Sequence, residues 1–200
     1  MAIDAATVKK LRDACGVGMM ECKMALTEAE GDMDEALKIL RKKGMATADK
    51  KSSRATNAGL IDYYIHPGAQ VGVLIEVNCE TDFVARNDNF KAFVHDVAIH
   101  IAASSPLWVS REDVPADVVA SEVEIYAAQA KTSGKPEAVI AKIAEGKLNK
   151  WYTDVVLLEQ PFVKDPEKSI EDLRREIIAK IGENIEVRRF VRFKVGEGVA

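Results

Sequence analysis

The spacing of apolar residues follows a helical period in the first part of the chain. Over residues 4–44, apolar positions recur every three or four residues, as the buried face of a helix requires. Glycines break the pattern at residues 16–18 and at Gly31, so we expect three helices, the last of which ends at Gly44. The pattern predicts a small three-helix domain over residues 1–44, and the candidate inward positions of its second helix are Met20, Met24 or Cys22, and Leu26.

Two aspartates stand where the first and third helices should begin. Asp4 precedes the first helix, and its side-chain oxygen can accept a hydrogen bond from a free backbone N–H. Asp32 and Glu35 have the spacing of a capping box, in which each side chain accepts from the backbone N–H of the other residue. Both positions support the predicted helix starts.

Residues 45–57 differ in character from the helices before them. Lys50, Lys51 and Arg54 stand among small and polar residues with only Asp49 to oppose them, which is typical of a solvated linker or a frayed helix. Such a basic run either forms a solubilising face or contacts an acidic surface of a partner, and the sequence leaves both interpretations open.

From residue 59 onward the apolar period becomes two. Residues 60–65 and 71–77 flank a His66-Pro67-Gly68-Ala69 turn, which predicts a β-hairpin. Helical spacing returns over residues 90–101. We expect further helices over 116–131, 136–158 (interrupted near Gly146) and 170–181, and a closing strand over 185–195. The fold class is therefore α+β, with a small antiparallel sheet covered by helices.

A short motif occurs twice in this second part of the chain. Residues 80–84 and 159–163 both read E-x-x-F-V, each after an apolar strand-like run and before an amphipathic helix. We hypothesise that residues 58–110 and 150–200 are two diverged halves of one core. This requires the two motifs to follow similar backbone paths.

Composition and charge narrow the class of protein. Apolar residues make up 48% of the 200 residues, enough for a packed core. Lys and Arg total 28 against 32 Asp and Glu, and the net charge of −4 gives no general attraction to nucleic acid. The three cysteines form no C-x-x-C pair, which favours a reducing compartment. Without a membrane-length apolar run or a secretory signal, we expect a cytoplasmic protein with no membrane partner.

Candidate catalytic chemistry is sparse in this sequence. His95 and His100 are five residues apart, about 140° around a helix, so they cannot share a metal as an i, i+4 pair does. Glycine motifs that bind phosphates or dinucleotides are absent, and Cys79 fits a small buried residue better than a nucleophile. We predict no catalytic residue, no metal site and no cofactor.

Thr81-Asp82-Phe83 stands where a strand gives way to a helix. In one interpretation Thr81 or Asp82 caps the helix and Phe83 packs inward. In the other, Phe83 is an exposed wedge for binding, as aromatic anchors on loops often are. Met19 and Met20 pose a similar choice, because neighbours on a helix cannot face the same way: we expect one to pack inside and the other to meet a partner.

Several motifs together resemble the translation elongation factor Ts family. They follow one another along nearly the whole chain: Leu11-Arg12, Gly18-Met19-Met20-Glu21-Cys22-Lys23, Ala25-Leu26, Gly31-Asp32, Leu40-Arg41, Asn78-Cys79-Glu80-Thr81-Asp82-Phe83-Val84-Ala85-Arg86-Asn87, Leu157-Leu158-Glu159-Gln160-Pro161-Phe162-Val163 and Phe193-Lys194-Val195-Gly196-Glu197-Gly198. The first 44 residues are similar to the family's ubiquitin-associated-like (UBA-like) domain. In length the chain is similar to the short members, which lack the coiled-coil insertion of longer ones.

The resemblance implies guanine-nucleotide exchange on elongation factor Tu, with no covalent chemistry. It implies that Asp82 and Phe83 enter the G domain of that partner near its Mg²⁺ site. Thr81 would shape their turn, and Val84 belongs to the same partner-binding motif. Phe162 follows a proline rather than Thr-Asp, so we expect it to be structural.

The resemblance also implies a division of labour along the chain. Arg12, Met19 and Met20 of a UBA-like domain (1–44) would contact a helix of the G domain, a basic linker (45–57) would follow, and residues 58–200 would form the exchange core. Short members can pair through their core sheets, so a homodimer is an alternative to a monomer. The rival class is a binding adaptor whose three-helix unit recognises a helix or a ubiquitin-like surface.

Overall fold

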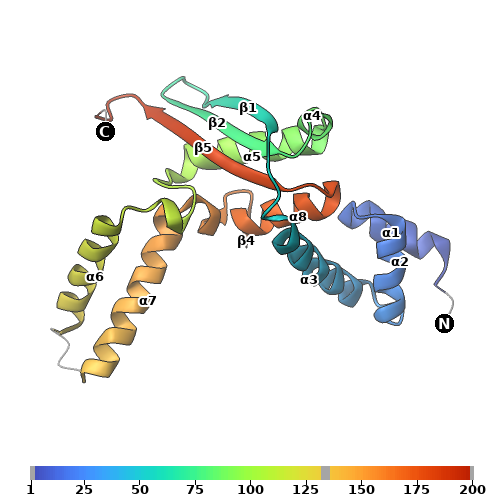
Figure 1. Ribbon diagram of the computed structural model, residues 1–200, viewed down its shortest axis with the longest axis horizontal. Coiled ribbons are helices and arrows are strands. Elements are labelled where there is room, and N and C mark those ends of the chain that lie inside the picture. Colours follow the sequence, from blue (N-terminus) through green and yellow to red (C-terminus); the bar gives the residue numbers. More distant parts are fainter. Residues whose placement is uncertain (1–2, 132–135, 199–200) are drawn as a thin grey trace. The chain divides into compact units, whose positions relative to one another are not determined.

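The computed structural model describes residues 3–131 and 136–198 and confirms the predicted α+β class (Figure 1). Its α-helices are α1 (Ala5–Cys15), α2 (Met19–Glu28), α3 (Met33–Lys51), α4 (Asp82–Ala85), α5 (Asp88–Ser104), α6 (Ala116–Lys131), α7 (Glu137–Val155) and α8 (Ile170–Ile181). Its strands are β1 (Ala58–Ile65), β2 (Val71–Cys79), β3 (Pro161–Phe162), β4 (Asp165–Ser169) and β5 (Ile185–Lys194), and its short 3-10 helices are η1 (Arg111–Asp113) and η2 (Leu157–Glu159). Across the described ranges, no helix combines the length and the apolar character needed to cross a bilayer.

The chain forms two compact units, each assembled from separate stretches of sequence. The first takes in the chain up to Ile61 together with Glu76–Val94 and Asp172–Val187. The second takes in Asp62–Ile75, His95–Glu171 and the chain from Arg188 onward. Residues far apart in sequence therefore contribute to each unit.

The three predicted N-terminal helices are present as α1, α2 and α3. They bury one apolar cluster, whose members include Leu11, Cys22, Leu26 and Leu40. Asp4 caps α1, because its Oδ1 accepts from the backbone N–H of Thr7 at 2.7 Å. The helix starts and the inward positions Cys22 and Leu26 are thus confirmed.

The predicted capping box of α3 forms only in part. The Asp32 side chain accepts from the Glu35 backbone N–H at 2.9 Å, as expected. The return bond is not made, since the Asp32 N–H donates to the Ala29 carbonyl and the Glu35 carboxylate accepts from Lys38. The preceding turn satisfies the Asp32 N–H before Glu35 can reach it.

The expected end of α3 at Gly44 is wrong, because the helix continues to Lys51. A Cβ built on Gly44 would lie 3.1 Å from the Cβ of Ala179 in α8, so this glycine allows a close helix approach instead of ending the helix. Ala48 is buried in the added turns. The first half of the expected linker is therefore helical.

The main sheet has the strand order β1-β2-β5 (Figure 1). β1 and β2 form the predicted hairpin, in which the Ala69 N–H donates to the His66 carbonyl at 2.9 Å and Gly68 takes a φ of 92°. The Val195 N–H donates to the Gln70 carbonyl at 2.9 Å, which brings the end of β5 to the start of β2. β5 is therefore antiparallel to β2, as predicted.

The predicted helices of the second part of the chain are also present. α5 buries Phe90, Phe93, Val94, Val97 and Ile101, the residues whose spacing predicted it.

α6 and α7 lie side by side as a helical hairpin (Figure 1). Val119, Leu148 and Tyr152 belong to one apolar cluster at its base. The chain thus carries a paired-helix arm, although its length resembles that of members expected to lack a coiled-coil insertion. α7 is continuous through Gly146, so the predicted interruption is wrong; one glycine costs a long helix only about 1 kcal/mol.

The two E-x-x-F-V motifs have different backbone conformations. Phe83 lies in helix α4, whereas Phe162 lies in strand β3, which pairs with β4. Phe162 is 5% exposed, which fits the structural role expected for it. The motif therefore gives no support to a core made of two repeated halves.

Candidate functional site

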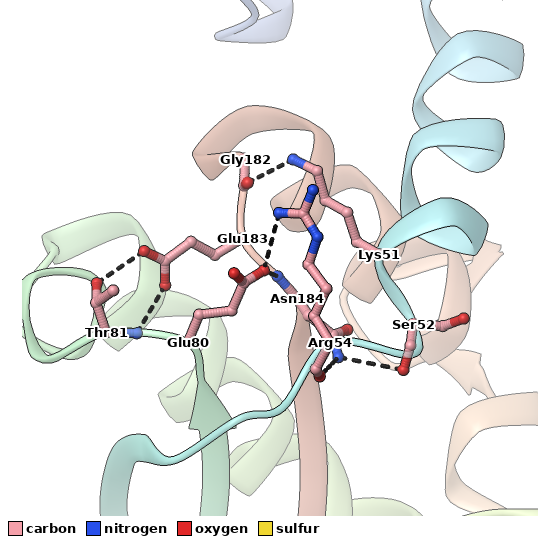
Figure 2. Close-up of polar contacts among 8 residues, drawn as sticks. All are labelled: Lys51, Ser52, Arg54, Glu80, Thr81, Gly182, Glu183 and Asn184. Atoms are coloured by element: carbon pink, nitrogen blue, oxygen red, sulfur yellow. Dashed lines mark hydrogen bonds and ion pairs between the residues drawn. The ribbon is translucent and has the colours of Figure 1, made fainter.

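The segment of residues 80–83, here called the Thr81 turn, leads from the end of β2 into the short helix α4. Thr81 has an extended backbone and caps α4, its Oγ1 accepting from the Val84 N–H at 3.5 Å. Its own N–H and hydroxyl donate to the two carboxylate oxygens of Glu183, at 3.0 Å and 2.7 Å (Figure 2). Hydrogen bonds to a carboxylate are stronger than neutral ones. Glu183 therefore holds the turn from the segment that follows α8.

Phe83 projects from this turn into solvent. Its side chain is 81% exposed, whereas the next residue, Val84, is 8% exposed and anchors α4. The inward-packing interpretation of Phe83 is therefore wrong. Val84, predicted to contact a partner, lies mainly beneath the turn and reaches the surface only where it lines a groove.

Asp82 is exposed beside Phe83. Its Oδ2 accepts from Arg86 Nη2 at 2.8 Å, one helical turn away, and both side chains are more than half exposed. An exposed pair of this kind contributes little to stability. The Arg86 guanidinium therefore partly neutralises the Asp82 carboxylate, and a partner can displace it at low cost.

A second set of polar contacts ties the residues after α3 to the same region (Figure 2). Asn184 Nδ2 donates to the carbonyls of Ser52 and Arg54, at 3.3 Å and 2.8 Å. The Asn184 N–H donates to Glu80 Oε1 at 2.6 Å, and Arg54 Nη1 donates to the same oxygen at 3.5 Å. Asn184 is buried, so the three bonds that it donates are partly shielded from water. The segment 182–184 thus connects the end of α3 with the Thr81 turn.

Two basic residues of the expected linker, Lys51 and Arg54, contact their own chain. Lys51 Nζ donates to the Gly182 carbonyl, and Asp49 pairs with Arg175 at 3.2 Å (Figure 2 shows the Lys51 bond). With Arg54 bound to Glu80, the charges at positions 51 and 54 have a structural role that neither sequence interpretation included.

The predicted partner-facing residues of the N-terminal helices are all exposed. Arg12 lies on α1, and Met19 and Met20 open α2 with 41% and 69% of their surface exposed. The expectation that one methionine packs inside is wrong, as are the inward positions proposed for Met20 and Met24, because Cys22, Ala25 and Leu26 fill the buried face. Met24 is exposed one turn after Met20 and extends the same apolar surface.

A groove brings Arg12 together with Phe83 and Val84, but the predicted residues Met19, Met20, Thr81 and Asp82 are not part of its lining. It has a volume of about 640 Å³ and is lined by Arg12, Asp13, Gly16, Phe83, Val84, Asn87, Asn89, Lys180 and Ile181. Lys180 Nζ donates to Asn89 Oδ1 at 2.7 Å, and its stem lies so close to Gly16 that a Cβ there would clash. Lys180 and Asn89 belong to no motif, so sequence analysis could not find them.

Cys79 lies shortly before Thr81 in the sequence and is buried. Burial, with a contribution from Glu183, raises the pKa of the Cys79 thiol to about 11, and its Sγ donates to the Thr81 carbonyl at 3.2 Å. Such a thiol is not a ready nucleophile. In the part of the chain that the structure describes, no three His, Cys, Asp or Glu side chains gather as a metal site would require.

Comparison with known proteins shows the family of the chain. A family model described as "Elongation factor TS" matches residues 4–197. The chain belongs to the elongation factor Ts family. It is 58% identical to an elongation factor Ts of Geotalea uraniireducens, over 100% of this chain and 93% of the relative. The proteins of the same name from Geobacter sulfurreducens and Moorella thermoacetica are each 56% identical, covering 100% and 98% of this chain and 92% and 97% of the relatives.

Membership in the elongation factor Ts family assigns the chain a general role. It is an elongation factor of protein biosynthesis and a nucleotide exchange factor.

Proposed function

We propose that this chain releases GDP from elongation factor Tu by inserting Asp82 and Phe83 into the G domain near the Mg²⁺ and phosphate site. The observation that carries the proposal is the side chain of Phe83, 81% exposed on a short helix whose capping residue is bound by Glu183. An apolar ring in water gains free energy when a partner buries it. A fixed base under the ring lowers the entropy lost on insertion.

Exchange follows from thermodynamic linkage between two ligands of one partner. GDP is held by a phosphate loop and by Mg²⁺, which require a fixed geometry. If this chain prefers the partner without that geometry, it must weaken GDP binding by the same factor by which GDP weakens its own binding. Only contacts that differ between the two partner states contribute.

The size of the effect can be bounded from the ring alone. Burying a Phe side chain contributes about 1.5–3 kcal/mol, and about 1.4 kcal/mol changes an equilibrium tenfold. Burial of Phe83 therefore accounts for an acceleration of GDP release of about 10-fold to 100-fold. Other contacts must supply any further coupling.

The N-terminal helices supply affinity and orientation in this proposal. Arg12, Met19 and Met20 are exposed, and Arg12 lines the groove that also contains Phe83. A partner helix that packs against these residues would bring the G domain within reach of Asp82 and Phe83. We assign this role to a UBA-like domain (1–44), followed by the connecting segment 45–57 and the core 58–200, acting in the cytoplasm without direct contact to nucleic acid.

The decisive experiment is the release of fluorescent GDP from purified elongation factor Tu. Phe83→Ala should slow release at least tenfold while a complex still forms. Leu107→Ala, which truncates an exposed apolar residue that does not line the groove, should leave release unchanged. Equal rates for wild type and Phe83→Ala would refute the wedge role, and no acceleration by wild type would favour the adaptor.

We also propose that two copies of the chain pair through the core sheet. The face of the sheet formed by Tyr63, Ile65, Leu74, Phe193 and Val195 is exposed and apolar, and it surrounds a hollow of about 450 Å³. Apolar patches of this kind commonly mark protein interfaces. Wild type should sediment at twice the chain mass of 21.9 kDa, and Phe193→Asp at the chain mass, with Leu107→Asp as control. A wild type that sediments as a monomer at tens of micromolar would contradict this pairing.

A further inference from the structure

Two of the three cysteines lie in contact within the N-terminal helices. Cys15 is the last residue of α1 and Cys22 lies in the first turns of α2. Their sulfur atoms are 3.7 Å apart, and neither is bonded to another cysteine. Cys79, the third cysteine, is buried at the end of β2.

The segment between the two thiols can accommodate a bond between them. A disulfide needs a sulfur–sulfur distance of about 2.05 Å, so the two atoms must approach by less than 2 Å. Cys15 and Cys22 are separated by the Gly16-Val17-Gly18 turn, and Gly16 already has a φ of 68°. Glycines of this kind absorb small backbone adjustments at low cost.

We propose that Cys15 and Cys22 form a reversible disulfide site that low-molecular-weight disulfides, such as oxidised glutathione, oxidise. In the first step the Cys15 thiolate attacks one sulfur of the glutathione disulfide; a mixed disulfide forms and one glutathione thiolate leaves. In the second step the Cys22 thiolate attacks the Cys15 sulfur, and the second glutathione leaves. Two cysteine thiols are oxidised, one glutathione disulfide is reduced to two thiols, and the two cysteine protons pass to solvent or to the glutathione thiolates.

The surroundings of the two thiols determine the order of these steps. Cys15 is half-buried, so an external disulfide can reach it, whereas Cys22 is completely buried. Burial, and then the contact with Cys15, raise the pKa of the Cys22 thiol to about 12. Cys22 therefore ionises rarely at neutral pH, and ring closure should become faster as the pH rises toward 9.

The bond would act on the surface proposed to meet the G domain, a consequence that rests on the proposed function. The Gly16–Gly18 turn lies between Arg12 and the Met19-Met20 pair in sequence, and Gly16 lines the same groove as Arg12. Drawing the two sulfurs together tightens this turn and shifts the start of α2. The oxidised chain should therefore bind elongation factor Tu at least tenfold more weakly than the reduced chain.

The site can be tested on the unmodified full-length chain by peptide mapping. Trypsin cleaves after Arg12 and Lys23, so residues 13–23 form one peptide that contains both cysteines, while Cys79 falls in the separate peptide 55–86. After treatment with oxidised glutathione and alkylation, peptide 13–23 should lack both alkyl groups and weigh two hydrogens less than its free dithiol form. A reductant should restore two alkylation sites. An unchanged, doubly alkylated peptide, or one that carries only bound glutathione, would overturn the proposal.

Variants separate this proposal from the proposed function. Cys15→Ser should prevent the mass loss and make binding to elongation factor Tu insensitive to oxidised glutathione. If the disulfide forms and binding is unchanged while Arg12→Ala weakens binding, the regulatory consequence is overturned and the proposed function stands. If Arg12→Ala also leaves binding unchanged, the assignment of the partner-facing surface itself is overturned, whatever the state of the cysteines.

Discussion

At the scale of single residues, Glu183 holds the Thr81 turn in place from another part of the chain. Its carboxylate accepts from both the N–H and the hydroxyl of Thr81. Glu183→Gln removes the charge and leaves a single acceptor oxygen, so the two charge-assisted bonds from Thr81 cannot both be kept. We expect the saturating rate of GDP release to fall several-fold, with little change in the concentration of chain at half saturation, in a fluorescent-GDP assay.

Glu124→Gln provides the matched control for this change. Glu124 is exposed on α6, and its substitution removes the same charge without touching the Thr81 turn. A Glu183→Gln chain whose saturating rate equals that of Glu124→Gln would show that the turn does not depend on Glu183.

His100 makes stability depend on pH. Its Nε2–H donates to Gln160 Oε1 at 2.9 Å and its Nδ1 accepts from the Val163 N–H at 3.2 Å, so both nitrogens are satisfied by the neutral ring. Burial lowers the pKa of His100 below its ordinary value of 6.5. The unfolded chain therefore takes up the proton first, and the stability present above about pH 6.5 is lost as the pH falls. The midpoint of thermal unfolding should decrease between pH 7 and pH 5.

A pair of asparagine variants isolates the contribution of His100. His66→Asn changes an exposed histidine in the hairpin turn and should keep the pH dependence of the wild type. His100→Asn should be less stable at pH 7 and show a smaller decrease toward pH 5. If the two variants lose stability equally between pH 7 and pH 5, His100 is not the group responsible.

The sequence predicted which residues are candidates for binding, but it did not determine which of their side chains are exposed. Phe83 and Phe162 stand in the same E-x-x-F-V motif, yet one ring projects into solvent and the other is buried. The difference arises because Thr81 caps a helix that turns Phe83 outward, while Pro161 continues into a strand. Met19 and Met20 differ from prediction in the same way: both are exposed, because Cys22, Ala25 and Leu26 form the buried face of α2.

At the scale of elements, two glycines within helices test how packing modifies helix propensity. A Cβ at Gly146 of α7 meets nothing within 4 Å, whereas a Cβ at Gly44 of α3 meets Ala179 at 3.1 Å. Gly146→Ala should therefore stabilise α7 by about 0.5–1 kcal/mol. Gly44→Ala should gain less or destabilise, since α3 must move away from α8. Amide hydrogen exchange in each helix measures both effects, and an equal gain in protection at the two sites would contradict this explanation.

Helix boundaries were the least predictable feature of the elements. The periods of three to four and of two correctly gave α1, α2, α5, α8 and the hairpin, because burial on one face imposes those periods. The end of α3 and the continuity of α7 depend on contacts or their absence around Gly44 and Gly146. Local sequence carries no information about the helix that packs against it.

At the scale of the whole molecule, the groove could not be predicted from the sequence. Lys180 lies against Gly16 and bonds to Asn89, and these three residues come from distant parts of the chain. Similarly, the bonds from Asn184 to Ser52 and Arg54 join the end of α3 to the start of β5. Such pairings follow from tertiary packing, so the spacing of residues along the chain could not show that Arg12 and Phe83 line one groove.

The separation of roles between Arg12 and Phe83 gives the last prediction. If Arg12 supplies affinity, Arg12→Ala should raise the concentration of chain at half-maximal GDP release about tenfold and leave the saturating rate unchanged. If Phe83 acts on the nucleotide site, Phe83→Ala should lower the saturating rate with a smaller effect on half saturation, because its contact is made only as GDP leaves. Lys9→Ala, an exposed charge change on α1, serves as control. The two roles differ because binding energy that is equal in both partner states cannot drive GDP release. A variant pair with identical changes in both parameters would mean that the two residues form one undivided contact.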